Sequence, residues 1–179
     1  MQYKDERIEQ RLKARIRNIP DYPKPGILFR DITPLLKDPS MFDSCINELS
    51  RRMSEYTFDY IAGIEARGFI VGSVLANNLG VGFIPIRKQG KLPSDTAKIT
   101  YQLEYGMATI EMHKDAIEKG DRVFVTDDLL ATGGTARAAC DLIESLGGIV
   151  PGLAFIIELK DLGGREKLIG RDVLSLVEY

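Results

Sequence analysis

The strongest constraint on the fold of this chain is an alternation of short apolar runs with helical patterns, which starts near Asp59. Continuous apolar runs of this length fit strands that are buried on both faces. They lie at residues 59–64, 81–86, 122–126, 152–157 and 173–177. Helical patterns lie between them at 69–79 and 134–146. This alternation is typical of an α/β fold with a mainly parallel central sheet flanked by helices.

The N-terminal part of the chain has a different pattern. An amphipathic helix is expected over about residues 4–17, because apolar residues recur there at three- and four-residue spacing. The segment 20–39 then contains five prolines, which exclude a long helix or a central strand. A further helix is predicted over residues 40–55, with Ser40 as its N-cap. The length of 179 residues suits one domain, 1–179.

Residues 97–113 interrupt the alternation of strands and helices. On either side of Gly106 they alternate with a period of two, which predicts a β-hairpin that turns near Tyr105. Its position before the strand at 122–126 suits a lid over a site, and an ordinary edge hairpin fits the pattern equally well.

Bulk properties narrow the class of protein. The net charge of −2 gives no sign of a nucleic-acid-binding surface. Cys45 and Cys140 occupy apolar helical positions and are expected to be core thiols. The single histidine, His113, is expected to be exposed, so no built-in metal site is expected. No signal peptide or membrane span is visible, and we therefore expect a cytoplasmic protein that binds neither nucleic acid nor membrane.

The segment Val123–Thr135, VFVTDDLLATGGT, combines features that point to a ligand site. An apolar run ends in Asp127 and Asp128, and the turn 131–135 leads into a helix. In open α/β sheets, ligands bind beyond the carboxyl ends of the strands, and a glycine-containing helix start favours an anion. The turn has no lysine, so it is not the P-loop of ATPases, and we expect a phosphate that is held rather than transferred.

Two carboxylates beside a phosphate would repel it unless they meet hydroxyl groups or a bound Mg²⁺. The hydroxyls of a ribose are suitable hydrogen-bond donors. An isolated pair of aspartates would be explained better as a strand end and a turn. Because the glycine-containing turn follows this pair within a few residues, after an apolar strand, the sequence favours a sugar-phosphate site.

The whole segment resembles the phosphoribosyl-pyrophosphate signature of the type I phosphoribosyltransferases, an apolar strand followed by two acids and a [AS]TGGT loop. Further segments resemble the members of this family that act on adenine, and the resemblance runs from about Pro20 to the C-terminus. These segments are PGILFRDITPLLKDP at 25–39, ARGFIVG at 66–72, RKQGKLP at 87–93, LEYGMATIEMHKDAI at 103–117 and GREKL at 164–168. The resemblance implies the type I phosphoribosyltransferase fold, with the hairpin as a lid. Residues 1–39 would form a small N-terminal hood that contains the base-binding loop.

The resemblance also implies a reaction. The 5-phosphoribosyl group would pass from phosphoribosyl pyrophosphate to adenine, giving AMP and pyrophosphate through a transition state like an oxocarbenium ion. Asp127 and Asp128 would hold the ribose 2- and 3-hydroxyls. Mg²⁺ would be bound mainly through phosphoribosyl pyrophosphate, without a protein ligand. The 5-phosphate would be held by Ala131, Thr132, Gly133, Gly134 and Thr135.

The leaving pyrophosphate needs cations and amides. By resemblance, Arg67, Arg87 and Lys91 are the candidates, with Lys88 ranked behind them. Family members often have a non-proline cis peptide in the corresponding loop, and we expect one within residues 64–68. They also place the RKQGKLP loop near the active site of a partner subunit. A homodimer is therefore expected, with Arg87 acting either in cis or in trans.

The base would be bound by residues outside the acidic segment. By resemblance, Phe29 and Leu159 sandwich the adenine ring, and the backbone of Arg30 recognises its edge. Glu104, on the expected lid, would transfer a proton to or from the base at N7. The pattern of residues alone fits a core position for Phe29 and a solvent-facing position for Glu104, so both roles depend on the resemblance.

Three alternatives were weighed. A transferase for xanthine, hypoxanthine or guanine would carry the same sugar-phosphate motif and would differ in its base pocket. A ligand-sensing regulator with this fold would append a DNA-binding domain, for which the roughly twenty residues before the resemblance are too few. A nucleotide kinase is excluded by the missing P-loop lysine.

Overall fold

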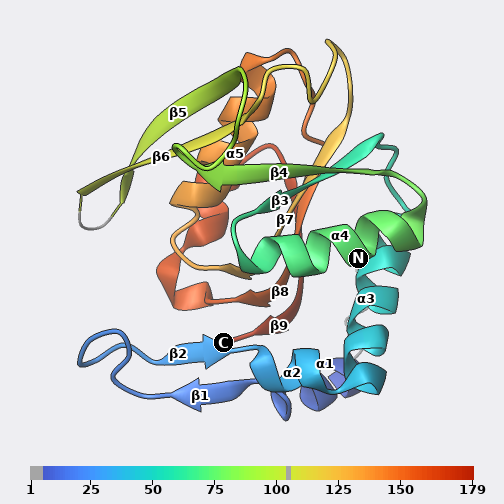
Figure 1. Ribbon diagram of the computed structural model, residues 1–179. Coiled ribbons are helices and arrows are strands. Elements are labelled where there is room, and N and C mark those ends of the chain that lie inside the picture. The colour runs from blue at the N-terminus through green and yellow to red at the C-terminus, as the bar shows by residue number, and fades with distance from the viewer. Residues whose placement is uncertain (1–5, 104–105) are drawn as a thin grey trace.

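The computed structural model describes residues 6–103 and 106–179, and within them seven strands form one large sheet (Figure 1). The strand order is β5-β6-β4-β3-β7-β8-β9. The neighbours from β4 to β9 pair in parallel, whereas β6 and β5 are antiparallel to their neighbours. The strands are β3 (Tyr60–Ile64), β4 (Gly82–Lys88), β5 (Thr96–Leu103), β6 (Gly106–His113), β7 (Val123–Leu130), β8 (Gly152–Glu158) and β9 (Asp172–Glu178). The mainly parallel sheet expected from the alternation is confirmed.

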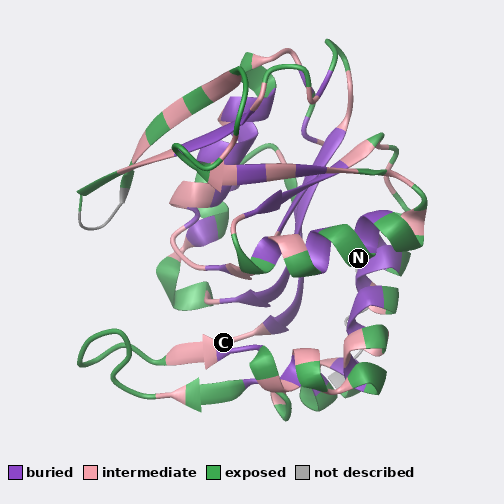
Figure 2. Cartoon of the chain, in the orientation of Figure 1, coloured by how far each residue is buried: buried purple, intermediate pink, exposed green. Residues whose placement is uncertain are grey.

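Helices cover both faces of this sheet. Helices α3 (Pro39–Met53) and α4 (Arg67–Leu79) lie on one face, and α5 (Gly134–Ser145) lies on the other. The buried residues accordingly form two clusters, and β7 contributes to both, with Phe124 on the α3–α4 side and Val125 on the α5 side. Strand β8 is buried along its whole length, and Figure 2 shows this buried layer between the helices.

The first residues of α4 lie unusually close to β7. A Cβ atom at Gly68 would lie 2.9 Å from the carbonyl oxygen of Thr126, and one at Gly72 would lie 2.7 Å from Thr126 Oγ1. Both glycines are therefore required by close packing rather than by a special backbone angle. The start of α4 is thereby held next to the residues that follow Thr126.

The N-terminal part forms a small sheet of its own. Helix α1 (Glu6–Lys13) ends before the predicted residue 17, because strand β1 (Arg17–Ile19) follows and pairs with β2 (Phe29–Asp31). The short helix α2 (Thr33–Lys37) comes next. The segment with five prolines thus contains neither a long helix nor a strand of the central sheet, as predicted. In Figure 1 this sheet lies beside the edge of the molecule formed by β9.

Two helices start earlier than predicted. Helix α3 is capped by Asp38 rather than Ser40, because Asp38 has an extended backbone and its Oδ1 accepts a hydrogen bond from the Met41 amide at 3.1 Å. Helix α4 begins at Arg67, which places this side chain at the helix start beside the central sheet.

The hairpin predicted at 97–113 is confirmed. Strands β5 and β6 pair along their full length, from Thr96↔His113 to Leu103↔Gly106. Strand β6 joins the central sheet through β4, and β5 packs against α5. Glu104 lies outside the described residues, so its position is left as a prediction. None of the helices in the described part of the chain is long and apolar enough to cross a membrane.

Candidate active site

Asp127 and Asp128 lie in the second half of β7, which runs to Leu130 instead of ending at residue 126 as predicted. Strand β8 pairs with β7 to its end, whereas β3 pairs with it only as far as Thr126. The two acids therefore lie at the carboxyl end of the sheet, beyond the last residue of β7 that pairs with β3. Successive residues of a strand point to opposite faces, so the two carboxyl groups have different surroundings.

Asp128 is buried and faces the start of α4. Its Oδ2 lies 2.5 Å from Arg67 Nε, yet this ion pair lacks hydrogen-bond geometry, and no described residue donates a hydrogen bond to Oδ2. The Arg67 guanidinium also lies 5.2 Å from the centre of the Phe29 ring. Asp128 therefore has an acceptor available for a ligand hydroxyl, and Arg67 connects the acids to the N-terminal sheet.

Asp127 is partly buried, and its Oδ1 would lie 3.0 Å from a Cβ atom at Gly68, in the first turn of α4. Its Oδ1 accepts a hydrogen bond from the backbone amide of Asp128 at 2.8 Å. The pKa of Asp127 is raised well above its ordinary value, because burial disfavours the charged form and the Asp128 carboxylate adds repulsion. Hydrogen bonds from the hydroxyl groups of a ligand would favour the charged form again.

The loop after β7 surrounds a small cavity. In this glycine loop, residues 131–135, Gly133 has φ of 76° and precedes α5, so Gly134 and Thr135 form the first residues of the helix. The cavity has a volume of about 100 Å³ and is lined by residues 129–136 together with Asp127 and Phe155. The free amides at a helix start and the helix dipole both favour an anion there. The cavity therefore suits the phosphate that the sequence predicted at residues 131–135.

The glycine loop is supported by a residue that the sequence analysis did not single out. Gly164 begins the 3₁₀ helix Gly164–Leu168 and contacts the loop through its backbone. A Cβ atom at Gly133 would overlap the carbonyl oxygen of Gly164, and one at Gly164 would overlap the carbonyl oxygen of Ala131. The GREKL segment carried the family resemblance, but a glycine without a ligand-binding side chain gave no signal of this contact.

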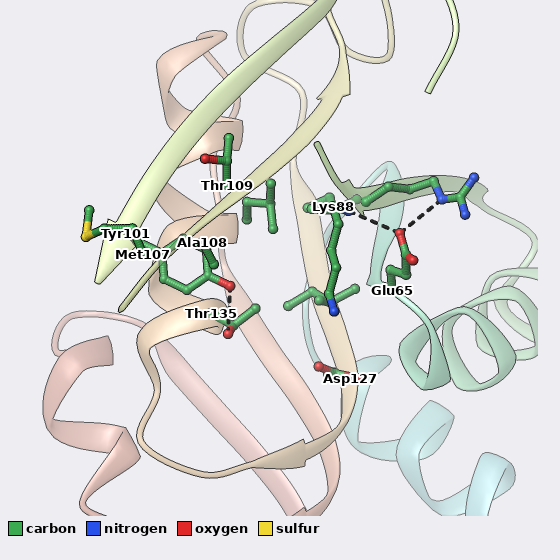
Figure 3. Close-up of a pocket in the computed structure, with 12 residues that line it drawn as sticks. Glu65, Lys88, Tyr101, Met107, Ala108, Thr109, Asp127 and Thr135 are labelled. Atoms are coloured by element: carbon green, nitrogen blue, oxygen red, sulfur yellow. Dashed lines mark hydrogen bonds and ion pairs between the residues drawn. The ribbon is translucent and has the colours of Figure 1, made fainter. Parts of the chain in front are cut away.

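A larger cavity of about 510 Å³ lies between the ends of β3, β4 and β7 and the hairpin (Figure 3). Asp127 and Thr135 line both this cavity and the smaller one. Tyr101 of β5 also lines it, and its hydroxyl donates a hydrogen bond to Thr135 Oγ1 at 3.0 Å. The hairpin therefore forms a wall of the cavity. Tyr101 is a second residue that the sequence analysis missed.

The predicted cationic side chains differ in whether they line the larger cavity. Lys88 extends into the cavity toward Asp127, and Arg87 also lines it (Figure 3). Glu65 Oε2 lies 3.2 Å from Arg87 Nε and accepts a hydrogen bond from the Lys88 amide at 3.1 Å. Lys91 is exposed on the following loop and does not line this cavity. Lys88, which the sequence ranked behind Lys91, is thus the better placed of the two.

The loop between β3 and α4 has the backbone geometry that was expected. The peptide bond between Glu65 and Ala66 is cis, as predicted for residues 64–68. The Glu65 amide donates a hydrogen bond to the carbonyl oxygen of Ile86 at 2.9 Å, which ties this loop to β4.

The predicted base-binding residues lie in two parts of the fold, with Phe29 and Arg30 on β2 and Leu159 after β8. Phe29 is partly buried and makes an edge-to-face contact with Tyr22, with 5.2 Å between the ring centres. The Arg30 guanidinium stacks on the ring of Tyr179 at 3.6 Å, so its side chain is engaged. Leu159 directly follows β8 and packs against the core on the α3–α4 side. The contact with Arg67 places Phe29 near the acids, and the sandwich of Phe29 with Leu159 is left as a prediction.

The two cysteines and the histidine occupy structural positions. Cys45 and Cys140 are buried, and burial raises the pKa of each thiol to about 12, so neither is a ready nucleophile. His113 is partly buried rather than exposed, with Nε2 2.6 Å from the carbonyl oxygen of Pro93. The described residues contain no group of three or more His, Cys, Asp or Glu that could hold a metal ion.

The fold and the site are those of a phosphoribosyltransferase, and the family model "Phosphoribosyl transferase domain" matches residues 33–167. The chain is 57% identical over 168 residues to adenine phosphoribosyltransferase of Solibacter usitatus, covering 94% of this chain and 97% of that protein. The chain therefore belongs to the adenine phosphoribosyltransferase family.

Solved structures of this family agree closely with the fold. Adenine phosphoribosyltransferase of Thermoanaerobacter pseudethanolicus superimposes with a TM-score of 0.93 at 52% identity, covering 95% of this chain and 99% of that one. The Saccharomyces cerevisiae enzyme, solved with D-2,5-dideoxy-2,5-imino-altritol 1,6-bisphosphate and adenine, superimposes with a TM-score of 0.89 at 41% identity, covering 96% and 99% of the two chains.

Proposed function

We infer that this chain transfers the 5-phosphoribosyl group of phosphoribosyl pyrophosphate to adenine, releasing AMP and pyrophosphate. The observation that carries the inference is that Asp127 and Thr135 line two adjoining cavities. The smaller one suits a phosphate, and the larger one contains the cations Arg87 and Lys88. A ribose between them would present hydroxyl groups to the acids, with a phosphate at one end and a pyrophosphate at the other.

The acids and the glycine loop hold the sugar phosphate in place. Asp127 and Asp128 accept hydrogen bonds from the ribose 2- and 3-hydroxyls, which lets both remain charged despite their proximity. The amides of residues 131–135 and the hydroxyls of Thr132 and Thr135 receive the 5-phosphate. The negative charge of the two aspartates also stabilises the positive charge that develops on the ribose ring in the transition state.

The larger cavity receives the pyrophosphate. Arg87 and Lys88 border it, and Glu65 fixes both through the Arg87 guanidinium and the Lys88 amide. Cations placed at the leaving group stabilise the charge that it gains as the bond to the sugar breaks. Arg67 and Lys91 complete the set of cations that we assign to pyrophosphate.

Magnesium fits this site through the substrate. The described residues offer the acid pair beside the cavities and no cluster of three protein ligands, which suits an ion held by substrate oxygens and water. When bound, Mg²⁺ would neutralise part of the charge of the pyrophosphate. The residues of the chain would orient the sugar and exclude water around it.

The base is bound by Phe29, Leu159 and the backbone of Arg30, and Glu104 exchanges the proton at N7 of adenine. The relative from S. cerevisiae was solved with adenine, which supports this choice of base. Substitution of Glu104 by Gln is expected to lower turnover and to leave binding of phosphoribosyl pyrophosphate nearly unchanged. Equal turnover in the variant would remove Glu104 from the mechanism.

We further propose that the chain works as a cytoplasmic homodimer. Ile70 and Val74 are exposed on one face of α4, as apolar residues at a subunit interface would be in an isolated chain. Both cysteines are free thiols, as expected in a reducing compartment. Sedimentation velocity tests the dimer directly, and a monomer at assay concentrations would contradict it.

The choice of base is tested by comparing four purines. The chain is incubated with phosphoribosyl pyrophosphate, Mg²⁺ and adenine, hypoxanthine, guanine or xanthine, and the nucleotides are separated by chromatography. We expect AMP to form far faster than the other nucleotides, because a pocket built for one hydrogen-bond pattern rejects another. Faster formation of IMP, GMP or XMP would assign the chain to a different purine.

A further inference from the structure

Glu111 is a buried carboxylate beneath the loop that carries Lys91. It lies on β6 with 1% of its side chain exposed, and it pairs in register with Arg87 of β4. Its Oε1 accepts hydrogen bonds from the backbone amides of Lys91 and Leu92, both at 3.0 Å. One carboxylate oxygen therefore fixes two successive amides in the loop between β4 and β5.

The second carboxylate oxygen has partners on β5. Glu111 Oε2 lies 3.4 Å from Thr96 Oγ1 and 3.3 Å from Lys98 Nζ. The amide of Leu92 and then the charge of Lys98 lower the pKa of Glu111 against the opposing effect of burial. The side chain is therefore a charged acceptor at neutral pH, and hydrogen bonds to a charged acceptor are the stronger kind.

Contacts continue from Glu111 to the larger cavity. The carbonyl oxygen of Lys91 accepts a hydrogen bond from Arg87 Nη1 at 3.0 Å. The same guanidinium contacts Glu65 through Nε, and Glu65 also holds the amide of Lys88. The position of Arg87 thus depends on the backbone of residue 91, which depends in turn on Glu111.

We propose that Glu111 is the positioning residue for the pyrophosphate end of the site. It would not touch the substrate. It would hold the backbone of residues 91 and 92 so that Arg87 and Lys91 are oriented before pyrophosphate binds. This role rests on the proposed function, because it assumes that these cations receive the pyrophosphate. If Glu111 only stabilised the hairpin, its substitution would weaken the binding of all ligands and the stability of the fold together.

The test compares variants of Glu111 in the full chain. Since the loop loses its charged acceptor, Glu111→Ala is expected to raise the KM for phosphoribosyl pyrophosphate about thirty-fold, and Glu111→Gln, which keeps a neutral acceptor, about five-fold. The KM for adenine should stay within about two-fold of the wild-type value. If the Ala variant does not fold, the Gln variant decides the question, by the change in its KM for phosphoribosyl pyrophosphate relative to the change in its KM for adenine.

Binding of single ligands separates positioning from general damage. Calorimetry with inorganic pyrophosphate and Mg²⁺ should show weaker binding to both variants, whereas AMP, which lacks the pyrophosphate, should bind as it does to the wild type. Lys98→Met is the matched control, because it removes a partner of Glu111 but leaves the hydrogen bonds to Lys91 and Leu92. It should leave the KM for phosphoribosyl pyrophosphate unchanged.

Two outcomes would overturn the proposal. In one, the folded Glu111 variants bind pyrophosphate as the wild type does. In the other, the affinities for adenine, AMP and pyrophosphate all fall by the same factor. Absence of AMP formation by the wild type would instead contradict the proposed function, and pyrophosphate binding would still decide the role of Glu111.

Discussion

Tyr101 donates a hydrogen bond to Thr135, and this contact joins the hairpin to the glycine loop. The two oxygens are 3.0 Å apart and belong to residues 34 positions apart in the chain (Figure 3). Because the phenol is the donor, the hydroxyl of Thr135 can still donate its own proton to a phosphate oxygen. The hairpin therefore orients a group that we assign to the 5-phosphate.

Removal of this hydroxyl tests that arrangement. We expect Tyr101→Phe to raise the KM for phosphoribosyl pyrophosphate about five-fold, because a neutral hydrogen bond contributes about 1 kcal/mol. The KM for adenine should not change. Tyr60→Phe, at the distant start of β3, controls for the loss of a phenol hydroxyl elsewhere. Steady-state kinetics with equal KM values for both variants would contradict the role of Tyr101.

The contact between Gly133 and Gly164 leads to a second prediction. An alanine at Gly133 would have a positive φ and would also overlap the Gly164 carbonyl oxygen. We expect Gly133→Ala to destabilise the fold by about 3 kcal/mol, from a strained backbone and overpacking together. It should also reduce kcat/KM for phosphoribosyl pyrophosphate at least about a hundred-fold, since misplacement by about 1 Å has effects of that size.

Gly120 provides the matched control for this variant. It has φ of 97°, and a Cβ atom there would meet nothing within 4 Å. Gly120→Ala should therefore cost only the backbone term, about 1 kcal/mol, and should leave the kinetics unchanged. Denaturant unfolding and kinetics on both variants separate the two effects. Similar losses of stability and activity in both would show that the contact with Gly164 is unimportant.

Asp127 is expected to favour function at the expense of stability. Its raised pKa means that the folded chain binds a proton at Asp127 more tightly than the unfolded chain does. Stability should therefore fall as the pH rises from about 4 toward the raised pKa. Asp127→Asn removes this penalty, so the substrate-free variant should melt at a higher temperature than the wild type at pH 8 and should differ less at pH 4.

The same variant should be a poor enzyme. Loss of a charged acceptor for a ribose hydroxyl is expected to lower kcat/KM for phosphoribosyl pyrophosphate about ten- to a hundred-fold. Thermal melts at the two pH values and initial rates at pH 8 measure both effects. A lower melting temperature together with full activity would reverse both signs and would rule out this account of Asp127.

Asp31 should contribute stability with the opposite dependence on pH. Burial would raise its pKa, but hydrogen bonds from the side chain and amide of Thr33 and the contact with Arg17 lower it to about 2. The contribution is therefore present above about pH 4 and is lost as the pH falls through about 2. Asp31→Asn should cost about 1 kcal/mol at pH 7, allowing for solvent screening, and much less at pH 2. Denaturant titrations with equal losses at both pH values would contradict this.

The acids and the glycine loop could be predicted from sequence because all of their signals lie in one short stretch. An apolar run, two acids, two glycines and a helical pattern follow one another from Val123. The length of β7 could not be predicted in the same way. Its apolar run stops at Asp127, and the strand continues only because β8 pairs with it as far as Leu130↔Glu158.

Residues whose partners lie far along the chain were missed for a related reason. In the sequence, Glu111 cannot be distinguished from the other polar residues of the alternating hairpin. Its role depends on the pairing of β6 with β4, which places it beneath the loop at residue 91. Gly164 and Tyr101 likewise gain their roles from contacts with the glycine loop. Lys88 lines the cavity and Lys91 does not, and the sequence does not show which of two neighbouring lysines points inward.

The most direct test of the function is the stoichiometry of the reaction. The chain is incubated with phosphoribosyl pyrophosphate, adenine and Mg²⁺, and AMP, pyrophosphate and ribose 5-phosphate are quantified at successive times. We expect one AMP and one pyrophosphate for each phosphoribosyl pyrophosphate consumed, without ribose 5-phosphate. Release of pyrophosphate with ribose 5-phosphate in place of AMP would contradict the account, because the chain would then be transferring the sugar to water.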